Sequence, residues 1–385
     1  MRIAIDAREL CGHSTGVGRY LGEIVREWCR LPEASSHEFV FCAPEPPAVP
    51  AGDHLSASVR VEPGRGIWWE QMVLPRLVRE AGADVLFAPG YSGPLHGRVP
   101  LVVAIHDVSF AAHPEWFRLR EGLRRRWVTR ASARRAARVL TISEFSRREI
   151  HDHLGVPLER ILVIPPGAGR GPVRGSGTGL TPASHNVLFV GSLFNRRHIP
   201  ELMDGFARLA RARPDVRLAV VGENRTFPHI DIERLRERSS VAGRIALTAY
   251  VAEETLGALY RDARACVFLS EYEGFGLTPI EALANGVPVV VLDTPVAREV
   301  CGAAAIYVAR PEPALIERAL DQALYDDEVR ARILREAPSV VARYSWRDCA
   351  SRVLAVLAEH GTPNPNRNRN TNPEAGTRNP ERQHP

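Results

Sequence analysis

The sequence of 385 residues predicts an α/β protein with two doubly wound domains, each built on a parallel sheet. Short runs rich in Val, Ile and Leu alternate with helical stretches along the whole chain. Because such fully apolar strands must be covered on both faces, they indicate parallel sheets between layers of helices. The length suffices for two or three hydrophobic cores. The predicted strands are 2–6, 38–44, 84–89, 101–107, 138–143, 161–165, 187–191, 217–222, 245–248, 265–270, 288–293 and 305–308.

A glycine-rich segment separates the two sets of predicted strands. This linker, residues 169–184, contains Gly-Arg-Gly-Pro-Val-Arg-Gly-Ser-Gly-Thr-Gly, a composition typical of flexible connections. We therefore expect an N-terminal domain over residues 1–168 and a C-terminal domain over residues 185–342, with a ligand cleft between them. Residues 361–385 contain almost nothing apolar, so we expect a disordered tail.

Composition and charge restrict the class of protein. The chain is 45% hydrophobic and 25% charged, with a net charge of +5, which favours an anionic partner. No run approaches the ~18 apolar residues of a membrane span. Six cysteines without regular spacing indicate reduced thiols, and a strand at 2–6 leaves no room for a signal peptide, so we expect a cytoplasmic protein. No acidic pair or His/Cys cluster suggests a metal, and no aromatic-interleaved element suggests nucleic acid.

Two glutamates, Glu273 and Glu281, flank a glycine-rich turn between a predicted strand and a predicted helix. The turn lies at the carboxyl end of its strand, where open α/β sheets bind ligands. Gly274 and Gly276 let the backbone approach a ligand, and the N–H groups of the following helix favour an anion. We therefore predict a phosphate-bearing ligand. The alternative for Glu281 is a capping box with Thr278 as N-cap, and for Glu273 a solvated loop acid.

A second strand-to-helix turn, Gly-Ser-Leu-Phe-Asn-Arg-Arg-His, starts at Gly191. Its adjacent arginines, Arg196 and Arg197, carry guanidinium groups that match the oxygens of a diphosphate. The alternative is a solvated surface pair. Since both turns favour phosphate and lie in the same half of the chain, each strengthens the interpretation of the other.

The first half of the chain adds two further candidates. Gly16 and Gly18 follow the first strand in a pattern one residue away from the dinucleotide fingerprint, and the second strand lacks its acidic residue. We therefore do not expect NAD, and we expect these glycines to let the first domain close on a ligand. His106 and Asp107 end a strong predicted strand, where the histidine can bind a sugar or orient a reacting group. The alternative is a core histidine.

Residues 117–139 contain nine arginines and one glutamate, interleaved with apolar side chains. Such a basic amphipathic helix can lie on an anionic membrane or bind a lipid-diphosphate acceptor. A solvated helix face explains the pattern equally well.

These residues resemble the pattern of a known family. The spaced glutamates with an internal Gly-Phe-Gly-Leu resemble retaining GT-B glycosyltransferases of the family that contains bacterial mannosyltransferases and sucrose-phosphate synthases. The segments Val103–Phe110 and His113–Phe117 resemble O-antigen-type mannosyltransferases in particular. The resemblance covers about residues 1–358. It implies two Rossmann-like domains facing a cleft, with a last helix within 343–360 that crosses back to the first domain.

The resemblance also implies a reaction and a set of residues. The reaction is transfer of a sugar, with mannose as the best candidate, from a nucleoside diphosphate sugar to a saccharide or lipid-linked saccharide, without a metal and with retention of configuration. A cytoplasmic enzyme of cell-surface polysaccharide synthesis, peripheral at the inner membrane face, fits this reaction. The implied catalytic residues are Glu273, His106, Arg196 and Arg197. The implied donor-binding residues are Glu281 at the ribose, Gly274, Phe275, Gly276, Leu277, Thr278, Gly191 and Ser192. The implied acceptor-side residues are Gly16, Gly18 and Asp107.

Two positions depart from the family's pattern, and other functions stay open. The family usually has Arg-Lys where this chain has Arg196 and Arg197, and sometimes Arg where it has Ser192. The alternatives are a nucleotide-sugar epimerase or sugar phosphorylase on the same architecture, or a non-catalytic nucleotide-sugar-binding subunit.

Overall fold

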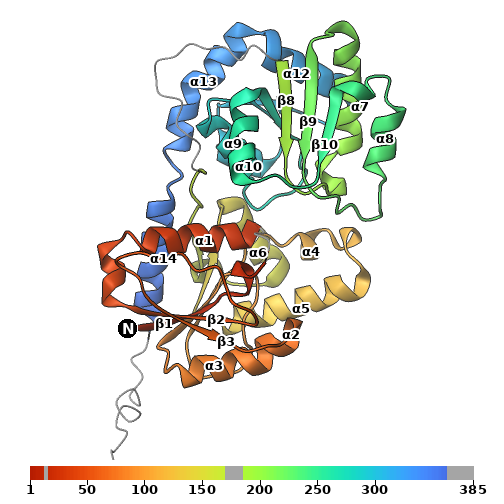
Figure 1. The fold of residues 1–385 in the computed structure, drawn as a ribbon. Coiled ribbons are helices and arrows are strands. Elements are labelled where there is room, and N and C mark those ends of the chain that lie inside the picture. Colours follow the sequence, from red (N-terminus) through yellow and green to blue (C-terminus); the bar gives the residue numbers. More distant parts are fainter. Residues whose placement is uncertain (13–15, 170–184, 362–385) are drawn as a thin grey trace, which may run out of the picture.

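The computed structural model describes residues 1–12, 16–169 and 185–361. Within these residues the chain forms two parallel sheets, one in each half of the molecule (Figure 1). The first sheet has the strand order β3-β2-β1-β4-β5-β6-β7, and the second has the order β10-β9-β8-β11-β12-β13. Helices cover both sheets, so the predicted pair of doubly wound domains is confirmed. Residues 170–184 of the predicted linker and 362–385 of the predicted tail lie outside the described residues.

The first sheet and its helices come from the N-terminal half of the chain. Its strands are β1 (Arg2–Asp6), β2 (Glu38–Ala43), β3 (Ser56–Val61), β4 (Val85–Ala88), β5 (Leu101–Ala104), β6 (Arg138–Thr141) and β7 (Ile161–Val163). Its helices are α1 (Gly16–Trp28), α2 (Gly66–Trp68), α3 (Leu74–Glu80), α4 (Ser109–Ala112), α5 (Leu119–Arg135) and α6 (Glu144–Leu154). A π-helical turn, Trp69–Val73, joins α2 to α3.

The second sheet follows the same plan. Its strands are β8 (His185–Val190), β9 (Val216–Val221), β10 (Ile245–Thr248), β11 (Ala263–Phe268), β12 (Val289–Leu292) and β13 (Ala305–Val308). The helices of this half are α7 (Ile199–Ala212), α8 (Ile232–Arg238), α9 (Glu253–Asp262), α10 (Leu277–Ala284), α11 (Pro295–Cys301), α12 (Pro313–Tyr325) and α13 (Asp327–Val341), and α14 (Trp346–His360) follows them.

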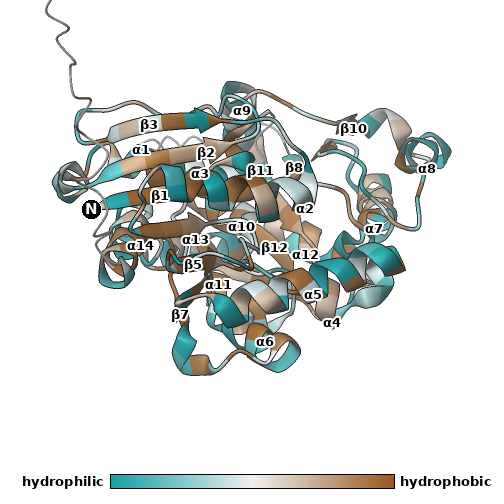
Figure 2. Ribbon diagram, turned by 90° about the horizontal axis from the view of Figure 1, so that it is seen from below, coloured by the Kyte–Doolittle hydropathy of each residue, from teal (hydrophilic) through white to brown (hydrophobic). Residues whose placement is uncertain are grey.

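The burial of each strand explains whether its position could be predicted from the sequence. The central strands β4, β5, β11 and β12 are buried along their whole length, and hydrophobic residues are concentrated on the strands whereas the outer helices carry hydrophilic segments (Figure 2). Strand β3 was not predicted, although it pairs with β2 in continuous register. It lies at the edge of the sheet and its residues, Ser-Ala-Ser-Val-Arg-Val, are mostly exposed, so it lacks the apolar run of a central strand.

The last helix, α14, returns to the first half, as predicted, and packs beside α1 (Figure 1). Ser345 caps it by accepting a hydrogen bond from the backbone N–H of Asp348. The indole N–H of Trp28 on α1 donates to the carbonyl of Ala350 at 2.9 Å. Apolar side chains of α14, including Leu357, share one buried core with those of α1 and the first sheet.

The amino end of α6 joins the two halves. Ser143 caps this helix by accepting from the N–H of Ser146, as the sequence suggested. The carboxylate of Glu299, on α11, accepts from the N–H groups of Glu144 and Phe145 at 2.7 and 2.9 Å. This contact between the halves brings the carboxyl ends of the two sheets to opposite sides of one cleft.

The thiols agree with the prediction of reduced cysteines. All six are free, and five of them are buried.

Among the described residues, no helix combines the length and the apolar character needed to cross a membrane.

Candidate functional site

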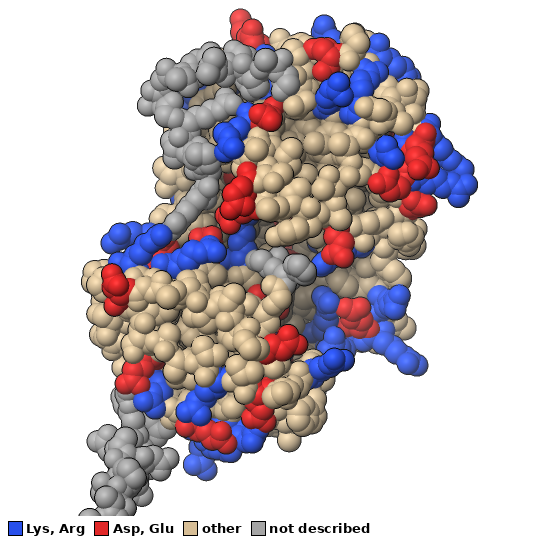
Figure 3. All heavy atoms as spheres, viewed as in Figure 1, with Lys and Arg blue, Asp and Glu red and all other residues tan. Residues whose placement is uncertain are grey.

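A cavity of about 960 Å³ lies between the two halves. Figure 3 shows the surface hollowed there, with Arg side chains along the rim of the lower half. The cavity is lined by residues at the carboxyl ends of β5, β8 and β11 and by the first turn of α10. The predicted site residues that line it are Gly16, His106, Asp107, Gly191, Ser192, Arg196, Arg197, Glu273, Gly274, Phe275, Gly276, Leu277 and Thr278. Gly18 and Glu281 do not line it: both are buried, Gly18 within α1 and Glu281 within α10.

Helix α10 begins at the glycine-rich turn, but not as a capping box. Gly276 is the N-cap and adopts φ +87°, a left-handed conformation that favours glycine. Thr278 therefore lies inside the helix, where its hydroxyl donates to the carbonyl of Val190 at 3.1 Å. The alternative explanation of Glu281, a capping box with Thr278 as N-cap, is wrong, because the left-handed glycine starts the helix two residues earlier. Gly276, Leu277 and Thr278 line the cavity, so the N–H groups that this first turn leaves without partners in the helix lie at the cavity edge.

Glu281 is buried behind the cavity, with 5% of its surface exposed. Its carboxylate lies 2.5 Å from the Arg19 guanidinium, which comes from α1 in the other half. The Tyr260 hydroxyl donates to its second oxygen at 3.2 Å. Burial raises the pKa of Glu281, while Arg19 and the Tyr260 hydrogen bond act in the opposite direction. Burying a carboxylate whose pKa is raised lowers the stability of the folded state. Residues that are retained despite such a loss of stability are often functional.

Glu273 and Arg197 orient each other at the cavity wall. Both Nε and Nη2 of Arg197 donate to one oxygen of Glu273, at 2.9 and 2.7 Å. The Ser270 hydroxyl donates to the same oxygen at 2.8 Å. Nη1 of Arg197 donates to the Ser192 carbonyl at 2.8 Å, which ties the two phosphate-favouring turns together. The two turns predicted from the sequence are therefore one structural unit.

Arg196 reaches across the cleft. Its guanidinium lies over the ring of Phe194 at 4.2 Å and 5.6 Å from the Trp116 ring of the first half. Arg225 and Phe227, which line the same wall, were not identified from the sequence. Their position shortly after the predicted strand 217–222 was the available signal, because ligands bind beyond the carboxyl ends of strands.

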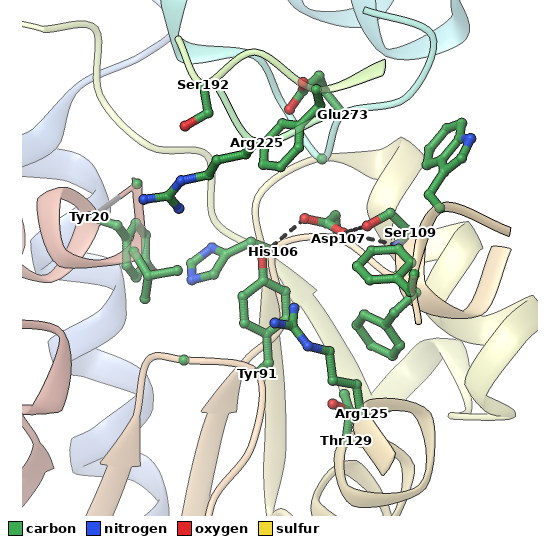
Figure 4. Close-up of a pocket in the computed structure, with 18 of the residues that line it drawn as sticks. Tyr20, Tyr91, His106, Asp107, Ser109, Arg125, Thr129, Ser192, Arg225 and Glu273 are labelled. Atoms are coloured by element: carbon green, nitrogen blue, oxygen red, sulfur yellow. Dashed lines mark hydrogen bonds between the residues drawn. The ribbon is translucent and has the colours of Figure 1, made fainter. Parts of the chain in front are cut away.

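His106 faces Glu273 across the cleft and is largely buried (Figure 4). Its Nε2 lies 2.8 Å from the Pro89 carbonyl. Since a carbonyl only accepts, Nε2 carries the proton, and Nδ1 of the neutral ring is an acceptor. Burial lowers the pKa of His106, so the neutral ring is favoured. The rings of Tyr20 and Tyr91 pack edge-on at 4.7 and 5.5 Å and hold its orientation.

Asp107 organises the loop after β5 (Figure 4). It accepts hydrogen bonds from the N–H and hydroxyl of Ser109 at 2.9 and 2.7 Å, and from the Tyr91 hydroxyl at 2.9 Å. Tyr91 has φ +70°, an uncommon conformation for a residue other than glycine. No pattern in the sequence pointed to Tyr91. Such backbone strain at a cavity wall is typical of functional sites.

Gly274 brings the glutamate turn against the first half. Its carbonyl accepts a hydrogen bond from the Ser146 hydroxyl at 3.0 Å and a second, short one from Ser143. A Cβ added at this position would lie 1.9 Å from the carbonyl oxygen of His106. Only glycine therefore permits this close approach of the two domains.

Metal-ligand chemistry is not evident in the part of the chain that the structure describes. No group of three His, Cys, Asp or Glu side chains there is arranged to hold a metal ion. The positive charge at the cavity comes from arginines instead.

Comparisons with known proteins agree with this architecture. Residues 180–340 match the family model of glycosyl transferases group 1, and residues 14–168 match that of glycosyltransferase family 4. Together the two matches span most of the chain. The chain is a glycosyltransferase, and its second half is a group 1 glycosyltransferase domain. In this glycosyltransferase the second domain carries the group 1 match, which includes both arginines and both glutamates of the predicted site.

Several curated relatives of this glycosyltransferase are mannosyltransferases. It is 25% identical to the O-antigen chain mannosyltransferase B of Escherichia coli, over 88% of this chain and 95% of the relative. It is 26% identical to the GDP-mannose:cellobiosyl-diphosphopolyprenol alpha-mannosyltransferase of Xanthomonas oryzae, over 68% of each chain. Over a shorter stretch, 27% of this chain and 24% of the relative, it is 42% identical to the mannosylfructose-phosphate synthase of Agrobacterium fabrum.

Solved structures show the same GT-B fold. The crystal structure of WaaG, a glycosyltransferase involved in lipopolysaccharide biosynthesis, has a TM-score of 0.72 and 16% identity, over 93% of this chain and 99% of WaaG. HepE from Anabaena, solved in complex with UDP-glucose, has a TM-score of 0.73 and 18% identity, over 93% of this chain and 100% of HepE.

Proposed function

We propose that this glycosyltransferase moves mannose from a nucleoside diphosphate donor to a saccharide or lipid-linked saccharide, with retention of configuration. The observation that carries the proposal is the unit of Arg197, Glu273 and the α10 amino end, which faces His106 across one cavity. The mannosyltransferases among its relatives favour mannose as the sugar. The same relatives favour a guanosine diphosphate donor and an acceptor used in cell-surface polysaccharide synthesis.

The leaving diphosphate is the first chemical requirement. As the bond to the sugar breaks, negative charge builds on the phosphate oxygens. Arg196 and Arg197 would neutralise that charge, and the N–H groups after Gly276 would donate to it. These groups are held in place before the substrate arrives, so no reorganisation is needed during the reaction. Because arginines supply the charge, we propose that no metal is required.

The acceptor hydroxyl is the second requirement. In a retaining transfer it attacks the sugar from the face that the diphosphate leaves, and its proton passes to the departing phosphate oxygen. His106 would accept a hydrogen bond from a donor-sugar hydroxyl at its unprotonated Nδ1, which fixes the ring of the sugar. Glu273, anchored by Arg197 and Ser270, would hold the other side of that sugar. Glu281 would bind the ribose after exchanging its contact with Arg19.

Helix α5 supports a peripheral position on a membrane. Leu119, Leu123 and Trp127 are 75%, 59% and 63% exposed and lie four residues apart on one face of the helix. Arginines such as Arg120 and Arg130 flank this apolar stripe. An exposed apolar stripe between basic residues fits the interface of an anionic bilayer. Arg124 and Arg125 of the same helix also line the cavity, so an acceptor held in the bilayer would enter it beside α5.

Donor turnover tests the proposal. The full-length protein is incubated with GDP-mannose, GDP-fucose, UDP-glucose, UDP-GlcNAc or dTDP-rhamnose, and release of the nucleoside diphosphate is measured. We expect release from GDP-mannose, its loss in Glu273→Gln, and wild-type release in Glu233→Gln, which alters an exposed, ion-paired glutamate of α8. Release from another donor would show that the transferred sugar is the one in that donor and not mannose. No release, and no binding of GDP or UDP by calorimetry, would overturn the function.

A further inference from the structure

A network of charged residues with two buried carboxylates lies at the first-domain end of the cavity, away from the arginine turn. Nη2 of Arg8 bridges two carboxylates, at 2.6 Å from Asp6 and 2.7 Å from Glu70. The Ser92 hydroxyl donates to the same Glu70 oxygen at 2.8 Å, and the Gln71 side chain donates to the other at 2.8 Å. The four elements involved are the end of β1, the segment after it, the π-helical turn and the segment after β4.

The network faces the cavity rather than the core. Arg8, Glu70 and Ser92 all line the cavity, while Asp6 supports them from behind. The Glu70 carboxylate projects from the π-helical turn Trp69–Val73, a distortion that is frequent at functional sites. If the network only stabilised the fold, an apolar cluster of similar size would serve equally well. Its position therefore points to a ligand.

The network leaves hydrogen-bonding capacity for that ligand. The Arg8 side chain is 24% exposed, and among the described residues its Nη1 donates to no protein acceptor, since its bonds to Asp6 and Glu70 use Nε and Nη2. The Ser92 hydroxyl donates its proton to Glu70 and keeps its oxygen lone pairs as acceptors. A fixed donor beside a fixed acceptor matches the hydroxyl groups of a sugar, which both donate and accept.

The charge at this end of the cavity selects against anions. Asp6 and Glu70 outnumber Arg8, and Glu9 lines the same wall, whereas Arg124 and Arg125 line the part of the cavity beside α5. At the opposite end the lining arginines outnumber Glu273. A diphosphate is therefore attracted to the second domain and repelled from the part of the first domain that carries Glu9 and Glu70. An uncharged ring pays no such penalty at the first-domain end.

We propose that Arg8, Glu70 and Ser92 form a subsite for an uncharged sugar ring of the acceptor. This inference rests on the proposed transfer of a sugar and adds where the acceptor binds and which acceptors are excluded. Arg8 donates from Nη1 to a ring hydroxyl, and Ser92 accepts from a neighbouring hydroxyl. Glu70 is a positioning residue, because it holds both groups. A saccharide with a carboxylate or phosphate on this ring is a poor acceptor.

Direct binding of simple glycosides tests the subsite without depending on turnover. Saturation-transfer NMR on the full-length protein, with GDP present, measures the binding of methyl α-mannoside, methyl β-glucoside and methyl β-glucuronide. We expect a neutral glycoside to bind and the glucuronide to bind at least tenfold more weakly. Arg8→Lys keeps the charge but loses the second donor group, so we expect it to weaken binding of the neutral glycoside about tenfold or more. We expect Ser92→Ala to weaken the same binding severalfold. Arg2→Lys, at the opposite end of β1 and paired with Glu38, is the control.

The outcomes separate the subsite from the reaction. Calorimetry with GDP and UDP on the same variants should give wild-type affinity, since the second domain is unchanged. The subsite is overturned if the wild type binds no neutral glycoside, if the glucuronide binds equally well, or if Arg8→Lys and Ser92→Ala bind like the wild type. If the proposed sugar transfer is wrong, the result is different: the wild-type protein binds neither GDP nor UDP and releases no nucleoside diphosphate from any donor.

Discussion

Replacing Gly274 with alanine tests whether the close contact of the two domains is needed for turnover. The added Cβ would lie 1.9 Å from the His106 carbonyl oxygen. Carbon and oxygen in contact stay about 3.3 Å apart, so the turn must retreat by about 1.4 Å. That movement would break the hydrogen bond from Ser146, now at 3.0 Å, and the one from Ser143. Glu273, the preceding residue, would move away from the histidine with the turn.

The size of the effect follows from this displacement. Two lost hydrogen bonds of about 1 kcal/mol each predict a destabilisation of about 2 kcal/mol. A misplacement of about 1 Å at a reacting centre predicts a loss of about 100-fold in kcat. Nucleotide affinity should change little, because Arg197 and α10 belong to the same domain as the turn and move together with it.

Three measurements check the Gly274→Ala prediction: the melting temperature, the kcat of donor-dependent nucleotide release and the calorimetric Kd for GDP. Gly243→Ala is the matched control, because its added Cβ meets nothing within 4 Å. Wild-type kcat and stability in Gly274→Ala would refute the reasoning, since the two domains would then react without this contact. A parallel loss of GDP binding would also contradict it, because the turn itself would have collapsed.

Three further predictions concern the glutamate, the histidine and the basic helix. Glu273→Gln should lower kcat at least 100-fold while the Kd for GDP, measured by calorimetry, changes less than about fivefold. Burial lowers the pKa of His106, so the unfolded chain binds more protons below about pH 6.5. The free energy of unfolding, measured in urea, should therefore fall as the pH falls from 7.5 to 5.5, and less steeply in His106→Asn. Replacing Leu119, Leu123 and Trp127 with serine should abolish sedimentation with phosphatidylglycerol vesicles.

Each of these predictions has an outcome that contradicts it. For Glu273→Gln, parallel losses of GDP affinity and melting temperature would indicate a structural role. For His106→Asn, a pH dependence as steep as that of the wild type would mean that the histidine does not titrate differently on unfolding. For the α5 variant, vesicle binding equal to that of the wild type would contradict a membrane role of the apolar stripe. Binding of the wild type to phosphatidylcholine as strongly as to phosphatidylglycerol would contradict the role of the arginines.

The sequence predicted those parts of the molecule whose signal is local. Central strands appear as apolar runs, and the turn from Glu273 to Gly276 is marked by two glycines at the end of such a run. The edge strand β3 was missed because one of its sides has no neighbouring strand and polar residues alternate with its apolar ones. The alternative that placed the N-cap of α10 at Thr278 was wrong, because a left-handed glycine at position 276 takes that position instead.

The contacts that the sequence could not predict join distant parts of the chain. Glu281 is paired with Arg19, more than 250 positions away and in the other domain. The network of Arg8, Glu70 and Ser92 draws on three separate segments, and none of them carries a recognisable motif. Such pairings depend on how the strands are ordered in the sheet, and the local patterns of one sequence do not reveal that order.

The return of α14 to the first domain has a consequence for how this chain folds. Trp28 and Ala350 are hydrogen-bonded across 322 positions, and Leu357 belongs to the same core as the first strand. During synthesis the first sheet therefore emerges long before the helix that seals it, so it must wait, incompletely covered, while the second domain is made. The second domain has no such dependence, since its strands and their covering helices are contiguous. Truncation before α14 should consequently leave the second domain folded and the first prone to aggregation.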